Sequence, residues 1–232
     1  MESTTGRLYF EMPQNKKLNR WIEYVCSASV VTDTATGRSL ILTAAHCVYD
    51  DVNKSFAQDV WFVPRLLDTT GSSDAFGCDQ ALGCWSADYG VVDSRWTTTR
   101  WPNNIAWDYG FYVVASTGNH LAVSGAGGVD SLEQSTGTLG ITWSAPSTNA
   151  HAAAIGYPYN YDPQLKYCEE TLTTTNANIN WWLPSCTMAG GSSGGPWLQP
   201  ISSGNGSVIS VNRWGYARKP GMAGPKVNGT SA

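Results

Sequence analysis

Short β-prone runs separated by turn-forming residues recur along this 232-residue chain, and they restrict its possible folds more than any other feature. Residues 24–31 and 39–43 flank a turn at 33–37 and predict a β-hairpin. No long stretch keeps the 3.6-residue apolar period of a helix, apart from a short turn at 44–49. Many short strands with Gly, Asn, Asp and Pro between them predict an all-β chain built as barrels or as a sandwich.

Further strands are expected in both halves of the chain. They are residues 7–10, 60–63, 89–92, 109–115, 139–143, 152–156, 177–182 and 208–211. The Gly- and Ser-rich segment 116–135 is the predicted internal boundary. The Gly/Pro-rich tail from Lys219 onward is expected to be poorly ordered.

Charged side chains are scarce, at 14% of the residues, whereas glycine, tryptophan and tyrosine are abundant. This composition is typical of a secreted all-β protein rather than of a cytosolic helical one. The formal net charge of -4 gives no reason to expect binding to nucleic acid or to an anionic membrane. No apolar run approaches the ~20 residues that a membrane-spanning helix needs.

Six cysteines form an even set. Pairing of sequence neighbours is the simplest arrangement, and it gives Cys26–Cys47, Cys78–Cys84 and Cys168–Cys186. The sequence has no C-x-x-C pair, so a metal site is not expected and an oxidising compartment is indicated. Residues 1–5 are polar and form no signal peptide, so we expect a secreted protein from which a leader, with any pro-segment, has been removed.

A glycine-rich turn at residues 191–196 has the sequence GSSGGP and holds a candidate nucleophile. A serine hydroxyl is a weak nucleophile at neutral pH and needs an adjacent base. Of the three histidines, His46 is the best candidate, because the segment 43–47 (TAAHC) places two small alanines before it. Ser193 is therefore the predicted nucleophile, and Ser192 is the alternative.

A carboxylate is needed to orient the histidine and to stabilise its charged form. Asp108 fits this role because it follows a tryptophan and directly precedes a strand-like run. Asp88 competes with it, since residues 87–92 have nearly the same pattern. With Asp108, the order along the chain is His46, Asp108, Ser193, as in a chymotrypsin-like triad.

The turn around the serine also predicts an oxyanion hole. Gly191 has no side chain to block its N–H group, and the Ser193 N–H would be the second donor. Loss of one such donor typically costs ~3 kcal/mol of transition-state stabilisation. The turn also spells the Gly-x-Ser-x-Gly of α/β-hydrolase esterases, but no histidine follows Ser193, so the order of residues excludes that fold.

Together these segments resemble the chymotrypsin-fold serine proteases, in the bacterial or fungal trypsin-like and glutamyl-endopeptidase-like branch. The matching residues are 26–31, 43–47, 107–111 and 190–197. The resemblance implies two perpendicular six-stranded antiparallel β-barrels with the active site in the cleft between them. The N-terminal barrel, residues 1–120, would carry the histidine and the aspartate, and the C-terminal barrel, residues 121–232, the serine. The resemblance also supports a Cys26–Cys47 bridge beside the catalytic histidine.

The chain differs from the digestive trypsin-like enzymes at the residue before the nucleophile. Those enzymes carry an aspartate there, which binds a newly cut amino terminus, whereas this chain has Ser192. The start of the chain also lacks the Ile-Val-Gly-Gly type of terminus. If the protein is made as a zymogen, we expect another activation route, or a site that forms without this switch.

The resemblance places the residues before the nucleophile and the strand 208–215 around the primary substrate pocket. Thr187 stands where trypsins carry an aspartate, so a preference for Arg or Lys is not favoured. Arg213 could bind an acidic side chain, although an exposed strand arginine is the plainer interpretation. Thr187, Asn212 and Trp214 could equally shape a neutral pocket.

The function implied is that of a secreted serine endopeptidase that cleaves protein or peptide substrates through an acyl-enzyme on Ser193. The alternative is a protease-like binding protein without activity. Such proteins usually lose a member of the triad, and none is lost here. We expect a monomer that requires no metal ion and no organic cofactor, with neither nucleic acid nor membrane as a partner.

Overall fold

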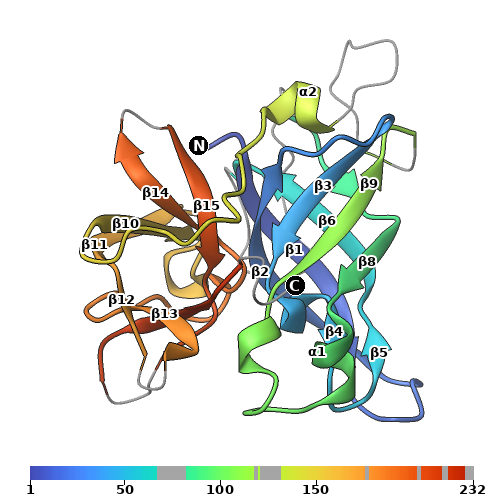
Figure 1. Cartoon of the computed structure of the whole chain (residues 1–232). Helices are drawn as coiled ribbons and strands as arrows, with labels where there is room; N and C mark the ends of the chain where they lie inside the picture. Colours follow the sequence, from blue (N-terminus) through green and yellow to red (C-terminus); the bar gives the residue numbers. More distant parts are fainter. Residues whose placement is uncertain are drawn as a thin grey trace.

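The computed structural model describes residues 1–66, 82–117, 120, 132–175, 178–202, 205–215 and 219–227. Within these ranges the chain is built of antiparallel strands joined by loops and short helical turns. Figure 1 shows the blue-to-green first half and the yellow-to-red second half as two curled β-structures that lie side by side. The predicted all-β, two-barrel fold is confirmed.

The strands of the first half are β1 (Thr5–Pro13), β2 (Trp21–Val31), β3 (Arg38–Thr43), β4 (Tyr49–Asp50), β5 (Ser55–Phe56), β6 (Gln58–Pro64), β7 (Trp85–Ser86), β8 (Tyr89–Val92) and β9 (Gly110–Ala115). Those of the second half are β10 (His151–Gly156), β11 (Lys166–Thr171), β12 (Thr173–Thr174), β13 (Asn180–Leu183), β14 (Pro196–Ser202), β15 (Asn205–Val211), β16 (Trp214–Gly215) and β17 (Met222–Pro225). The helical turns are η1 (Ala45–Cys47), α1 (Ser94–Thr98), η2 (Ile105–Trp107), α2 (Leu132–Thr136) and η3 (Tyr159–Tyr161).

The first half forms one seven-stranded sheet in the order β7-β6-β1-β2-β3-β9-β8. The predicted hairpin is present, since β2 pairs with β3 in the register Ser29↔Leu42. Leu8, Val30 and Ile41 are fully buried in its core. Strand β1 is buried on both faces because its outer face packs against the second half, where Arg7 hydrogen-bonds to Tyr157.

The second half contains two four-stranded sheets rather than one continuous sheet of six strands. Their orders are β11-β10-β14-β15 and β12-β13-β17-β16. A core that includes Leu183, Trp197 and Ile209 fills the space between them. Ile155 and Val211 belong instead to the core of the first half, so apolar packing is continuous across the junction that holds the site.

Two expectations about individual segments are wrong. Residues 139–143 form no strand but a link between the halves, with single bridges from Leu139 to Val31 and from Ile141 to Val208. The tail is ordered at β17, which is buried and paired on both sides, with β13 and β16. Most of the predicted boundary segment 116–135 lies outside the described residues, so the division at residues 120 and 121 stays a prediction.

Two of the predicted disulfides, Cys26–Cys47 and Cys168–Cys186, are confirmed. Cys84 is also bonded in a disulfide, but its predicted partner, Cys78, lies outside the described residues. In the part of the chain that the structure describes, no helix is long and apolar enough to cross a membrane.

Candidate active site

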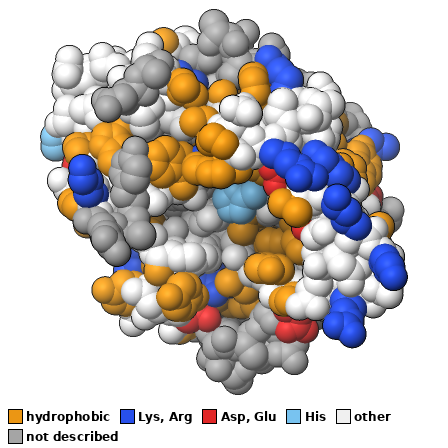
Figure 2. All heavy atoms as spheres, turned by 90° about the horizontal axis from the view of Figure 1, so that it is seen from below, with side chains coloured by type: hydrophobic (Ala, Val, Ile, Leu, Met, Phe, Trp, Pro, Cys, Tyr) orange, Lys and Arg blue, Asp and Glu red, His pale blue; other side chains and the backbone are white. Residues whose placement is uncertain are grey.

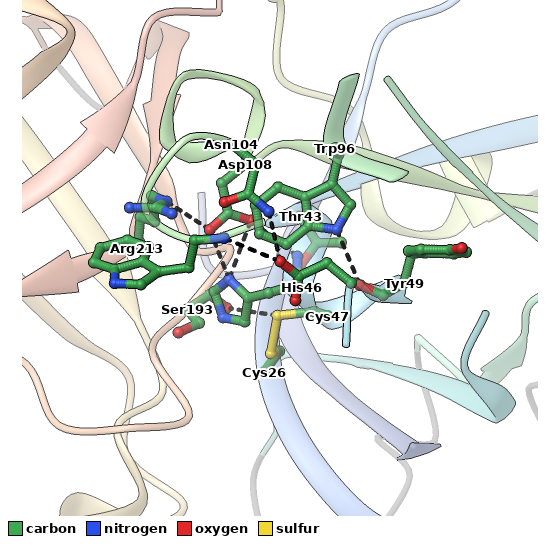
Figure 3. Close-up of polar contacts among 12 residues, drawn as sticks. Cys26, Thr43, His46, Cys47, Tyr49, Trp96, Asn104, Asp108, Ser193 and Arg213 are labelled. Carbon is green, nitrogen blue, oxygen red and sulfur yellow. Dashed lines mark hydrogen bonds and ion pairs between the residues drawn. A yellow bond between two sulfur atoms is a disulfide. The ribbon is translucent and has the colours of Figure 1, made fainter. Parts of the chain in front are cut away.

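His46 and Asp108 form the histidine–carboxylate pair that the sequence predicts. His46 lies in η1, directly after β3, and its backbone N–H donates to Asp108 Oδ1 at 2.9 Å. Its ring Nδ1 lies 2.9 Å from Asp108 Oδ2 and 3.1 Å from Oδ1 (Figure 3). Because a carboxylate only accepts hydrogen bonds, Nδ1 carries the proton and leaves Nε2 as the acceptor.

Asp108 is held as a buried anion. It follows η2 and precedes β9, and its side chain is 2% exposed. Burial alone would raise the pKa of Asp108, but the charges of His46 and Arg213, with the hydrogen bonds from His46, outweigh burial and hold that pKa at about 2. The carboxylate is therefore ionised at neutral pH and can stabilise an imidazolium.

The rival carboxylate, Asp88, lies away from this pair. It is exposed next to β8, where its backbone N–H donates to Val113 O. Of the two carboxylates that the sequence leaves open, only Asp108 hydrogen-bonds to His46 in the described structure.

Ser193 lies on the open side of His46. Both residues line a cavity of about 350 Å³, and Ser193 also lines a second cavity of about 310 Å³. Ser192 is buried instead, and its hydroxyl donates to Ala189 O at 2.9 Å. Within the described residues Ser193 Oγ and His46 form no hydrogen bond, and such bonds often tighten only once substrate is bound.

The turn around Ser193 has a shape that requires glycine. Gly191 and Gly194 have φ angles of 89° and 84°, in the left-handed region that side chains disfavour. A Cβ atom on Gly194 would also collide with Thr43 Oγ1 and Ser27 O. Among the described residues, the N–H groups of Gly191 and Ser193 donate no hydrogen bond, so both are available to an oxyanion.

Ser27 on β2 fastens this turn to the first half of the chain, a role that the sequence analysis missed. Its N–H donates to Ser193 O at 2.7 Å, and its hydroxyl donates to Gly191 O at 2.8 Å. The same hydroxyl accepts the Tyr157 N–H at 2.8 Å. These contacts hold the oxyanion turn without a carboxylate at position 192.

Asn212, predicted in the substrate pocket, lies behind the turn instead. It is 1% exposed, and its Nδ2 donates to Ile155 O at 2.7 Å and to Ser192 O at 2.9 Å. Its Oδ1 accepts the indole N–H of Trp197 at 2.7 Å. Asn212 therefore supports the nucleophile turn and does not line either cavity at Ser193.

The cavity of about 310 Å³ has the position of a primary substrate pocket. Its walls include Thr187 and Trp214, as predicted, together with Met188 and Met222. Arg213 is the only charged residue among its described lining residues, but the arginine side chain is 2% exposed and bound to Asp108. Arg213 is thus neither an exposed strand arginine nor free to pair with an acidic substrate side chain.

The cavities at Ser193 belong to a wider hollow in the surface. Seen from below, hydrophobic side chains gather around this hollow, and a histidine lies beside it (Figure 2). Trp101 is 56% exposed and packs edge-on against Trp214, which lines the smaller cavity, with 5.9 Å between ring centroids.

The fold is the chymotrypsin-like fold, and the structural neighbours of highest TM-score among those compared are serine proteases. One is the thermostable serine protease AL20 from an extremophilic microorganism, at 27% identity and a TM-score of 0.75, covering 98% of this chain and 92% of AL20. Another is the protease Anisep from Arthrobacter nicotinovorans, at 28% identity and a TM-score of 0.72, covering 97% of this chain and 90% of Anisep. A Glu endopeptidase, at 15% identity and a TM-score of 0.65, covering 99% of this chain and 87% of its own, shares the fold alone. No protein-family model and no curated protein sequence matches the chain.

Proposed function

We propose that this protein is a secreted serine endopeptidase that hydrolyses peptide bonds through an acyl-enzyme. The observation that carries the proposal is the buried Asp108 carboxylate bound to His46 Nδ1, with Ser193 beside the same histidine at the mouth of two cavities. The disulfides support an extracellular location. We expect the protein to act as a monomer on protein or peptide substrates, without a metal ion or organic cofactor.

In the proposed reaction Ser193 Oγ attacks the scissile carbonyl while His46 Nε2 accepts its proton. The N–H groups of Gly191 and Ser193 donate to the oxyanion that forms. His46 then gives the proton to the leaving amine, and the acyl group stays on Ser193. Water, deprotonated by His46, attacks this ester and releases the acid. Asp108 stays ionised throughout and stabilises the imidazolium.

The primary pocket supports a preference for neutral residues before the scissile bond. Among the described residues no acidic side chain lines it, so a substrate Lys or Arg would find no partner there. Its one arginine is already bound to Asp108, so a substrate carboxylate gains no free cation. Met188, Met222 and Trp214 offer apolar contacts. A cleavage profile on a proteome-derived peptide library tests this, and dominant cleavage after charged residues would contradict it.

Labelling with a fluorophosphonate tests the proposed nucleophile. The wild-type protein and the Ser192→Ala variant should form an adduct on Ser193, and Ser193→Ala should not. Hydrolysis of casein should likewise disappear only in Ser193→Ala. If folded wild-type protein neither reacts nor cleaves casein, the protein is not an endopeptidase and the alternative, an inactive binding protein, replaces this proposal.

A further inference from the structure

Arg213 and Asp108 form a fully buried ion pair inside the site. Arg213 follows β15, and its Nε donates to Asp108 Oδ2 at 2.6 Å. Both side chains are 2% exposed. Asp108 lies between Arg213 and His46 in Figure 3, so one carboxylate serves two cationic partners. The two partners are 167 residues apart in sequence (213 minus 46), and neither local segment indicates the contact.

The surroundings keep the arginine charged despite its burial. Its guanidinium lies over the Trp101 ring, with 4.5 Å from Cζ to the ring centroid. Burial lowers the pKa of Arg213, while the negative charges of Asp108 and Asp51 raise it. Since an arginine starts from a pKa above ~12, it stays protonated at any pH at which an enzyme works.

The hydrogen bonds fix the carboxylate in one orientation. Oδ1 accepts the His46 backbone N–H and lies 3.1 Å from the ring Nδ1, while Oδ2 accepts both the shorter contact from the His46 ring, at 2.9 Å, and Arg213. The Arg213 charge is therefore in direct contact with the oxygen that holds the imidazole. A lone carboxylate stabilises an imidazolium strongly, but a carboxylate that is already paired with a cation stabilises it less.

We propose that Arg213 is a positioning residue that shares the Asp108 carboxylate with His46 and weakens the hold of that carboxylate on the imidazolium. The role of Arg213 in catalysis rests on the proposed protease function. The effect of its charge on the protonation of His46 does not depend on that function. It follows that the positive charge of Arg213 opposes protonation of His46, which must be neutral to act as a base.

Other charged groups near His46 act in the opposite direction. Tyr49, Asp50 and Asp51 line the same cavity as His46, and the two carboxylates favour an imidazolium. Both carboxylates are fixed by hydrogen bonds, Asp50 to the N–H of Val52 and Asp51 to the side chain of Asn104. They remain in place when Arg213 is changed, so a comparison of Arg213 variants isolates the arginine charge.

The test is an NMR titration of His46 in full-length protein that carries Ser193→Ala to prevent self-cleavage. Replacing Arg213 by Gln removes the charge and keeps a side chain able to donate to Asp108, so the midpoint of the His46 NMR titration should move to higher pH. Replacing Arg213 by Lys keeps the charge, so the His46 titration should stay close to that of the parent. An unchanged His46 titration in the glutamine variant would overturn the inference.

Kinetics provide the second readout when Ser193 is intact. The acid limb of the kcat/KM profile should move to higher pH in Arg213→Gln, whereas Arg213→Lys should lower kcat without moving the limb, because lysine lacks the planar fork. If the glutamine variant does not fold, Arg213→Met keeps an aliphatic stem under Trp101 and serves instead. An inactive wild-type protein would contradict the protease proposal. An unchanged His46 titration in Arg213→Gln would contradict only the role proposed for Arg213.

Discussion

Asp108 is the residue on which the charges of the site converge, and its ionisation contributes to the stability of the fold. Its pKa in the folded state is about 2, against ~3.9 for an unfolded aspartate. A lowered pKa means that the folded state stabilises the ionised form of Asp108 relative to its protonated form. The contribution is therefore complete above pH ~5, and it is lost as the pH falls through ~2, amounting to about 2.6 kcal/mol.

Because the ionised form of Asp108 stabilises the fold, we predict a pH-dependent loss of stability in Asp108→Asn. At neutral pH the variant should unfold more easily than the wild type by about 3–5 kcal/mol, because Arg213 is left buried without an anion. Between pH 5 and pH 2 this difference should shrink by about 2 kcal/mol, since the wild type loses its own ion pair there. Urea unfolding at a series of pH values measures both quantities, and kcat/KM should fall about 10⁴-fold.

Asp88→Asn provides the control, since Asp88 is exposed and was the rival in the sequence. The difference in free energy of unfolding between this variant and the wild type should be small, and it should not shrink between pH 5 and pH 2 as that of Asp108→Asn does. A difference between Asp108→Asn and the wild type that stays constant from pH 5 to pH 2 would show that folding does not lower the pKa of Asp108.

Residues inside recognisable local segments could be predicted, and residues that act across the fold could not. His46 and Ser193 each lie in a short run of small residues whose composition indicates a tight turn beside a cleft. The resemblance predicts Asn212 and Arg213 in the substrate pocket, but only Arg213 lines it, and the sequence does not show the distant partners of either side chain. Their hydrogen bonds reach Ile155, at a separation of 57 residues, and Asp108, at a separation of 105.

Among the elements, β2 organises the site by contacting both of its loops. Cys26 on this strand is bonded to Cys47 next to the histidine, and Ser27 hydrogen-bonds to the turn that carries the nucleophile. Thr43, at the end of β3, donates to Ser27 O at 2.8 Å and so completes the connection. A strand in the middle of the first sheet thereby fixes the distance between base and nucleophile.

The role of β2 predicts a selective loss in Ser27→Ala. The variant leaves the buried Tyr157 N–H without an acceptor and frees the Gly191 carbonyl, so stability should fall by about 1–3 kcal/mol. Because the oxyanion turn is loosened, kcat should fall by more than KM rises. Steady-state kinetics and urea unfolding on the same preparation measure the two effects.

Ser29 on the same strand offers a matched control. It is fully buried like Ser27, but within the described residues its hydroxyl has no hydrogen-bond partner. Ser29→Ala should therefore leave kcat unchanged and should keep or slightly raise the stability. Equal kinetic losses in the two variants would mean that β2 acts through packing alone and not through the Ser27 hydroxyl.

Two strands that sequence reasoning missed, β11 and β14, lack the usual apolar residue pattern of a strand because of where they lie in the sheet. β11 is an edge strand with little apolar character, and Tyr167 in it is 74% exposed. β14 begins at Pro196 and contains Pro200, residues that normally argue against an inner strand. It pairs with β10 only at Trp197 and Leu198, and its pairing with β15 shifts register after Gln199, so Pro200 is tolerated.

At the scale of the whole molecule, a second ion pair, between a buried arginine and a partly buried aspartate, joins the two halves. Arg7 on β1 lies 2.6 Å from Asp162, which follows η3, and it also donates to Tyr157 O at 2.7 Å. Burial lowers the pKa of Arg7 and raises that of Asp162, in both cases against the attraction of the partner. The cost of removing both charges from water therefore exceeds their mutual attraction.

This imbalance predicts that breaking the pair is more harmful than replacing it. Asp162→Asn leaves Arg7 buried without its anion and should lower the free energy of unfolding by about 3–5 kcal/mol, whereas Arg7→Met combined with Asp162→Leu should restore most of that loss. The four proteins of the double-mutant cycle can be compared by urea unfolding. Purely additive losses would show that the two charges act independently.

The double variant should nevertheless react more slowly with a fluorophosphonate. The residue that replaces Arg7 no longer donates to the Tyr157 carbonyl, and the Tyr157 N–H supports the oxyanion turn through Ser27.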